Sequence, residues 1–157
     1  MSSVVVAGDV SGSVTLSAPS VAGSTVLTLP TTSGGLFTQG NIVGIVSQSS
    51  GVPTGSVIES GSNASGQYVK YADGTMICYM SNSTTPVANT LTSSTHSFPA
   101  TFSVAPILSC ACDSALYGTA VVGMTARTPT TTTYTQTILR TNTSPTSLFV
   151  IAVGRWF

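Results

Sequence analysis

The stretch GQYVKYADGTMICYM, residues 66–80, decides the fold class. Two strand-like runs, 67–71 and 75–80, flank the residues ADG, and a Gly closing so short a connection suits the left-handed position of a bulged hairpin. We therefore predict that Asp73 and Gly74 are turn residues, with the Asp73 carboxylate bonded to nearby backbone. Alternation in the second run places three apolar side chains on one face of the strand: Met76, Cys78 and Met80.

Short alternating runs closed by Gly, Pro or Asn recur along the chain, and no window repeats apolar residues at helical spacing. We therefore expect an all-β chain whose strands pair in antiparallel fashion. The further strands are expected at 13–18, 24–30, 41–46, 107–113, 119–125, 134–141 and 147–154.

Charged residues are scarce. The 157 residues include four Lys and Arg and four Asp and Glu, so the formal net charge is zero, while Ser and Thr account for 51 residues. Hydroxyls hydrate a surface without repulsion, so nothing electrostatic keeps copies of the chain apart. A closed symmetric oligomer would cover the uncharged strand edges. We expect a subunit of an assembly, with Lys70 pointing outward from the hairpin.

Several partner classes are disfavoured. Nucleic-acid binding needs clustered Lys and Arg, whereas the four here are scattered: Lys70, Arg127, Arg140 and Arg155. No apolar run approaches the roughly eighteen residues of a membrane span, so no membrane insertion is expected. The first residues lack the cationic start and long apolar run of a signal peptide. The chain is therefore expected to stay in the cytoplasm until an assembly carries it out.

Composition divides the chain into three parts. Residues 47–66 are almost entirely Ser, Gly and other small residues, as is typical of a linker or an extended connection. Residues 1–46 are too few to build a core of their own, so their strands need partners, and identical chains are the nearest supply. We expect these residues to form an attachment and trimerisation segment. Residues 67–157 suffice for a compact antiparallel β-sandwich.

Catalytic motifs are missing from the sequence, including the P-loop, the dinucleotide fingerprint and the G-x-S-x-G elbow. A glycosidase needs two carboxylates about 5–10 Å apart. The acidic residues are far apart in sequence, and Asp73 and Asp113 meet only if their strands are neighbours: Asp9, Glu59, Asp73 and Asp113. We expect neither an enzyme nor a cofactor.

The cysteines and the single histidine leave alternatives open. Three thiolates and one imidazole are a valid zinc set: Cys78, Cys110, Cys112 and His96. A Cys-x-Cys on a strand points both sulfurs to one face without the usual knuckle spacing, so small buried cysteines explain the residues as well. A disulfide between Cys78 and one of the pair is a further alternative. For His96, we favour a surface or turn position over a role as a metal ligand. We predict no metal site.

Ligand recognition by exposed aromatic and hydrogen-bonding side chains is the remaining chemistry. Four residues in loop-like or strand-end positions are candidates: Tyr117, Arg127, Tyr134 and Arg140. Arg offers a planar fork for carboxylate or phosphate groups on a cell surface. In the alternative interpretation the tyrosines half-fill the core and the arginines pair with Asp113 or Glu59 across subunits. The terminal VGRWF, residues 153–157, is expected to plug the sandwich or a neighbouring subunit.

Two parts of the chain resemble tailed-bacteriophage proteins. Residues 6–35, VAGDVSGSVTLSAPSVAGSTVLTLPTTSGG, resemble a segment that precedes or attaches larger modules in tail fibres and related virion proteins. Residues 53–78, followed by 96–113 and 147–157, resemble the C-terminal domain of tail-fibre and receptor-binding proteins related in shape to H-type lectins.

The second resemblance is carried by an ordered series of motif positions. These are Asp73, Gly74, Ile77 and Cys78, then Phe98, Pro99, Phe102 and Pro106, then Ala152 and Gly154. The chain departs from the family pattern where the closing motif has Trp, because that position is Val150 and the only Trp is Trp156. This departure weakens any transfer of a lectin sugar site.

The resemblance implies a homotrimeric, elongated virion component made in the bacterial cytoplasm. Its N-terminal segment would attach it to other virion proteins, and its sandwich would sit at the distal end and adhere to a host glycan or protein. The alternative is a trimeric capsid decoration, head-fibre or collar protein that binds no host ligand. A polysaccharide-degrading tip would require a carboxylate pair.

Overall fold

The computed structural model describes residues 3–17, 20–21, 23–24, 26, 31, 39–112 and 121–157. The chain divides into two compact units, Met1–Leu36 and Phe37–Phe157. In the first unit, β1 (Ser3–Ala7) and β2 (Ser13–Ser17) form an antiparallel hairpin. Across the described residues, strands dominate and the one helix is the single turn α1 (Gln39–Ile42), which confirms the all-β prediction. In this part of the chain, no helix has the length and apolar character needed to span a membrane.

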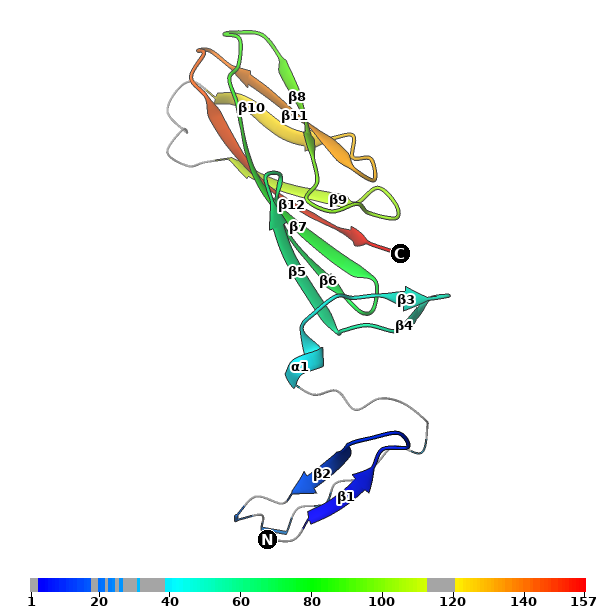
Figure 1. Ribbon diagram of the computed structural model, residues 1–157. Helices are drawn as coiled ribbons and strands as arrows, with labels where there is room; N and C mark the ends of the chain where they lie inside the picture. The colour runs from blue at the N-terminus through cyan, green and yellow to red at the C-terminus, as the bar shows by residue number, and fades with distance from the viewer. Residues whose placement is uncertain are drawn as a thin grey trace. The chain divides into compact units, whose positions relative to one another are not determined.

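The second unit contains two larger antiparallel sheets (Figure 1). The five-stranded sheet has the spatial order β5 (Ile58–Asn63), β6 (Gly66–Tyr71), β7 (Thr75–Thr84), β12 (Thr146–Arg155) and β9 (Ile107–Cys112). The three-stranded sheet has the order β10 (Val121–Arg127), β11 (Thr133–Arg140) and β8 (Thr92–Ser97). A small hairpin joins β3 (Gln48–Ser49) to β4 (Val52–Pro53).

The two larger sheets share one hydrophobic core, as expected of a β-sandwich. The inner face of β7 contributes the three apolar side chains predicted from alternation, and all are buried: Met76, Cys78 and Met80. β12 adds Leu148, Val150 and Ala152, and the opposite sheet adds Tyr134. An edge-to-face pair, Phe98 and Phe102, closes the core with ring centroids 5.1 Å apart.

The predicted turn between β6 and β7 is confirmed. Gly74 has φ +93°, which is the left-handed region that favours glycine, and its amide donates to the Tyr71 carbonyl oxygen at 3.0 Å. The Asp73 carboxylate accepts hydrogen bonds from the Thr75 amide at 2.8 Å and from the Thr75 hydroxyl at 3.1 Å. The turn is therefore stabilised by hydrogen bonds to the side chain of Asp73, one of its own residues.

Two local predictions were wrong. The run at 41–46 begins within helix α1 and is not a strand, although its backbone bonds to 56–58, where the Gly44 amide donates to the Ile58 carbonyl at 2.9 Å. Lys70 does not point outward: it lies opposite Met76 on the inner side of the sheet and pairs with Glu59.

Other expectations differ from the structure in their boundaries. The strand expected at 24–30 lies mostly outside the described residues. The segment 47–66, expected as a linker, contains β3, β4 and β5. The division between the two units lies ten residues before the expected end of the first segment, at Leu36 instead of 46.

Candidate functional site

The outer face of the five-stranded sheet carries a cluster of apolar side chains. Because neighbours along a strand point to opposite faces, the residues between the buried ones point away from the core. Cross-strand register aligns these outward side chains in rows. We call the apolar members of these rows the apolar face: Val69, Ile77, Val153 and Ile107 in one row, Tyr79 and Ile151 in the next, and Phe149 and Ala111 in the third. Polar side chains interrupt the second and third rows: Gln67, Ser109 and Ser81.

None of these side chains carries a charge, and several large ones are exposed. Phe149 is 48% exposed, Ile151 44% and Tyr79 43%. A contiguous apolar surface on four adjacent strands is a mark of an interaction site in a soluble protein. The apolar face therefore has the properties of a surface that another protein covers.

Two open hollows lie at the β5–β6 end of this face. One, of about 370 Å³, is lined by the 63–67 turn together with Tyr79, Ser81 and Phe149. The other, of about 390 Å³, lies between Gln67, Tyr79 and residues 60–62. Tyr79 borders both hollows.

The outer face of the three-stranded sheet has the opposite character. Its outward positions are Thr133, Thr135, Thr137 and Leu139 of β11, Ser93, Thr95 and Ser97 of β8, and Gly123, Thr125 and Arg127 of β10. Thr137 is buried. We call this the hydroxyl face, because most of its members carry a hydroxyl group. Arg127 is exposed, and its Nε donates to the Thr137 Oγ1 at 2.9 Å. This face suits contact with water or with polar groups.

Arg127 is therefore one of the sequence candidates that the structure places on a surface. Tyr134, in contrast, is fully buried, and its ring stacks on Phe98 with centroids 5.4 Å apart. Its hydroxyl accepts a hydrogen bond from Asn82 Nδ2 at 2.7 Å, and burial raises its pKa. The core interpretation fits Tyr134, because a ligand at the surface has no access to it.

Arg140 is also inaccessible, with 3% of its surface exposed. Its Nη1 donates to the Ser144 carbonyl oxygen at 2.9 Å and to the Thr146 hydroxyl, so it holds the connection between β11 and β12. Tyr117, like the expected Arg partner Asp113, lies outside the described residues. The four candidates are thus not brought together in the described part of the chain.

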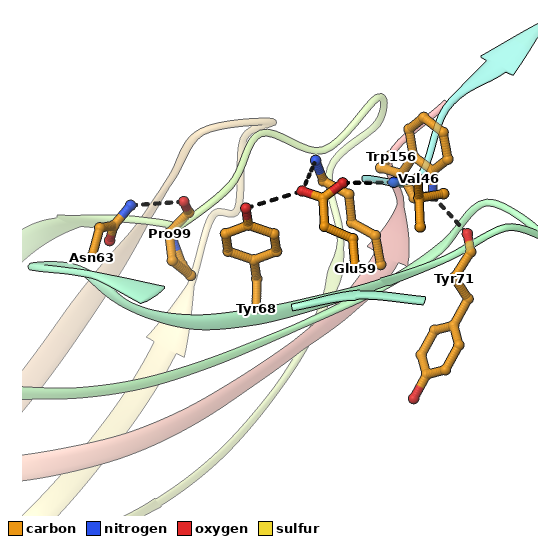
Figure 2. A network of polar contacts seen from close by, with 8 residues as sticks. Val46, Glu59, Asn63, Tyr68, Tyr71, Pro99 and Trp156 are labelled. Atoms are coloured by element: carbon orange, nitrogen blue, oxygen red, sulfur yellow. Dashed lines mark hydrogen bonds and ion pairs between the residues drawn. The ribbon is translucent and has the colours of Figure 1, made fainter. Parts of the chain in front are cut away.

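The C-terminal residues pack against the β6–β7 turn of their own chain. Arg155 Nη2 donates to the Asp73 carbonyl oxygen at 2.9 Å, and the Trp156 amide donates to the Gly74 carbonyl at 3.0 Å. The Trp156 indole N–H donates to the Tyr71 carbonyl oxygen at 2.8 Å (Figure 2). The predicted plug is confirmed within the sandwich, and Asp73 and Gly74 are structural in role.

A polar network centred on Glu59, on the inner side of β5 and β6, adjoins this plug (Figure 2). Glu59 accepts hydrogen bonds from the Val46 amide at 3.0 Å, the Tyr68 hydroxyl at 3.0 Å and the Lys70 ammonium at 3.2 Å. Lys70 Nζ also lies 5.8 Å from the Trp156 ring centroid. With all three donors pointing at one carboxylate, the network ties β5 and β6 to the preceding segment.

The network shifts the pKa values of its members. Burial raises the pKa of Glu59, but the Val46 amide, Lys70 and Tyr68 outweigh it, so the pKa lies below its ordinary value. The hydrogen bond that the Tyr68 hydroxyl donates to Glu59 raises the pKa of Tyr68, and burial raises it further. The carboxylate is therefore held ionised as an acceptor, which is a structural arrangement and not that of a general acid.

The cysteines are not joined in the described residues, where Cys78 and Cys110 are free. They lie on β7 and β9, on either side of β12, which puts their backbones about 10 Å apart, too far for a disulfide. Burial raises the pKa of the Cys78 thiol to about 11, which keeps it protonated. The described residues contain no cluster of three or more His, Cys, Asp or Glu side chains that could hold a metal.

His96 is a half-buried strand residue and not a surface turn residue. Its ring lies 5.7 Å from that of Tyr134, and burial lowers its pKa, although a bond with Gln136 opposes the shift. The neutral imidazole therefore belongs to the interior of the sandwich.

The apolar face was missed in the sequence, although a signal for it was present. The runs at 75–80 and 147–154 are apolar at both alternating positions, and a strand with this pattern is covered on both faces. Only one of those faces is used by the core of the single chain. The apolar residues on the second face are not needed to build that core.

No family model matches the chain, and no curated protein matches it. Similar solved structures include an N-truncated R1-type pyocin tail fibre, at 15% identity over 60% of this chain and 84% of that one, with TM-score 0.46. Two C-terminal fragments of R1 and R2 pyocin fibres of P. aeruginosa match 85% of this chain at 14% and 15% identity, each with TM-score 0.48. The chain covers 41% and 39% of these two fragments.

Proposed function

We propose that this chain is the subunit of a homotrimeric structural component of a tailed-phage particle, a short tail fibre or receptor-binding tip that adheres to the bacterial surface. The observation that carries the proposal is the contrast between the two outer faces of the sandwich. One carries a cluster of exposed apolar side chains, and the other presents mainly hydroxyl groups together with Arg127.

A closed oligomer uses these faces in opposite ways. Burying the apolar face between subunits removes its exposed side chains from water, at about 25 cal/mol for each Å² of apolar surface. The hydroxyl face then remains outside and keeps the assembly soluble without charge. Three parts of the proposal come from the resemblance of the sequence motifs. They are the trimeric state, the assignment to a phage particle and the attachment of residues 1–46 to other virion proteins.

Adhesion follows from repetition of a weak site. A shallow surface with a single exposed guanidinium offers a few hydrogen bonds to a cell-surface glycan or protein. Three identical copies raise the overall affinity without new contacts, because the second and third binding events are intramolecular. The binding role is therefore coupled to the oligomer.

The experiment is adsorption of purified, labelled protein to cells of the phage's host, with competition against infection. The wild-type protein is expected to adsorb and to reduce infection. Ile151→Asp, which places a charge in the centre of the apolar face, is expected to lower adsorption at least tenfold. Thr95→Asp, which places the same charge on the hydroxyl face away from the proposed interface, is expected to preserve the oligomer.

Adsorption by a dissociated Ile151→Asp subunit equal to that of the wild type would contradict the coupling of adhesion to assembly. A wild-type protein that forms the oligomer but adsorbs to no host cell would contradict the adhesive role and leave a purely structural one.

A further inference from the structure

The first unit contains no buried side chain among those that the structure describes. All described side chains from Val4 to Ser17 are exposed, as are those of Val21 and Val26, at 89% and 90%. An isolated two-stranded hairpin is marginally stable at best in water. Its strands therefore need a cover that the described residues of this unit do not supply.

The hairpin has two chemically different faces. Register pairs Val4 with Leu16 and Val6 with Val14, and these side chains form one wholly apolar face, which we call the quartet. The opposite face pairs Val5 with Thr15 and Ala7 with Ser13, so hydroxyls dominate it. The members of the quartet are 52% to 66% exposed.

The edges of the hairpin are equally unprotected. Both strands are edge strands of a two-stranded sheet, and neither contains a charged residue or a proline to block pairing. The first 58 residues of the sequence contain one charged residue, Asp9, which lies in the 8–12 turn. Nothing on the strands opposes contact with an identical hairpin.

We propose that the β1–β2 hairpin is a second self-association element, in which the quartet packs against the quartets of other copies of this chain. Amphipathic hairpins arranged around an axis place their apolar faces inside and their hydroxyl faces outside, and pairing of their edges leaves no edge free. This inference rests on the proposed homo-oligomer in one respect: assembly of the sandwiches raises the local concentration of the hairpins.

The occupant is a copy of the hairpin because both faces and both edges fit one. A foreign protein that covered the quartet alone would leave two uncharged edges open to aggregation. A symmetric arrangement covers the quartet and the edges with one kind of contact.

The test is amide hydrogen exchange on the full-length chain, combined with its sedimentation. Val6 and Val5 are adjacent, and both are 58% exposed, but Val6 belongs to the quartet and Val5 to the hydroxyl face. They therefore form a matched pair of positions. Val6→Ser and Val5→Ser remove the same apolar surface and the same strand propensity from the chain.

We expect the amides of β1 and β2 to be protected in the wild-type oligomer and in Val5→Ser. In Val6→Ser their exchange is expected to be at least tenfold faster, while the amides of β7 and β12 stay unchanged. An oligomer with unprotected β1 and β2, or with protection that appears only in the whole particle, would overturn this inference alone. Protected strands in a monomer would also overturn it, and an unprotected monomer would overturn both this inference and the proposed assembly.

Discussion

The indole N–H of Trp156 donates to the carbonyl oxygen of Tyr71 at 2.8 Å and fastens the C-terminal end of the chain to the β6 side of the β6–β7 turn. The two residues are 85 positions apart in the sequence. The turn that decides the fold class is thereby closed by the last residues of the chain.

Trp156→Phe is expected to lower the free energy of unfolding. It removes one hydrogen bond worth about 1 kcal/mol, and the partner carbonyl stays partly buried, so the melting temperature should fall by roughly 2–4 °C. Removing residues 155–157 should have a larger effect, since it also removes the bonds of Arg155 to Asp73 and of the Trp156 amide to Gly74. Calorimetry of the purified proteins measures both, and unchanged melting on truncation would refute the role of the plug.

Glu59→Gln is expected to destabilise the protein above about pH 5 and to matter progressively less in acid. Because the folded pKa of Glu59 is lowered from its ordinary value of 4.5, ionised Glu59 stabilises the fold above that value. This contribution is lost as the pH falls through the folded pKa. Melting temperatures of the two proteins, compared between neutral pH and about pH 3, should therefore converge. A difference that is constant or grows in acid would show that the network has no such role.

Tyr134→Phe is expected to affect stability and not adhesion. The change deletes the hydroxyl that accepts from Asn82 and leaves a partly buried amide donor unpaired, which costs about 1–3 kcal/mol. The ring and its stacking on Phe98 remain. Chemical denaturation measures the loss, and the adsorption assay should be unchanged below the melting temperature. Lost adsorption with unchanged stability would return Tyr134 to the ligand candidates.

Arg127→Ala is the complementary change, because Arg127 is exposed on the hydroxyl face. It is expected to leave melting and oligomeric state within error and to weaken adsorption to host cells. Arg127→Lys keeps the charge and loses the planar fork, so it separates charge from geometry. Full adsorption by Arg127→Ala would move the adhesive site elsewhere.

The sequence predicted the parts of the fold that depend on local pattern. Alternation placed Met76, Cys78 and Met80 on the buried face, and the Asp73–Gly74 pair marked the turn. These features depend on residues a few positions apart. Local periodicity and turn chemistry therefore sufficed for them.

Features that depend on distant contacts were missed. β5 has the sequence IESGSN and looks like a linker, but the aromatic ring of Tyr68 on β6 lies where a Cβ at Gly61 would be, only 2.6 Å from it. Small residues in β5 thus make room for a large one in β6. The Glu59–Lys70 pair depends on the same unforeseen strand pairing, so Lys70 was expected on the wrong side.

The candidate binding residues were the hardest to predict, since exposure is a property of the finished sandwich. Tyr134 and Arg127 both lie in Thr-rich sequence, yet one fills the core and the other is exposed. The β10–β11–β8 pairing decides which face each residue takes, and neither composition nor spacing reports it.

Sedimentation velocity of the full-length protein at micromolar concentration tests self-association through the apolar face most directly. We expect the wild type and Thr95→Asp to sediment as a trimer and Ile151→Asp to sediment as a smaller species. A wild-type protein that is a soluble, cooperatively melting monomer at that concentration would contradict the account.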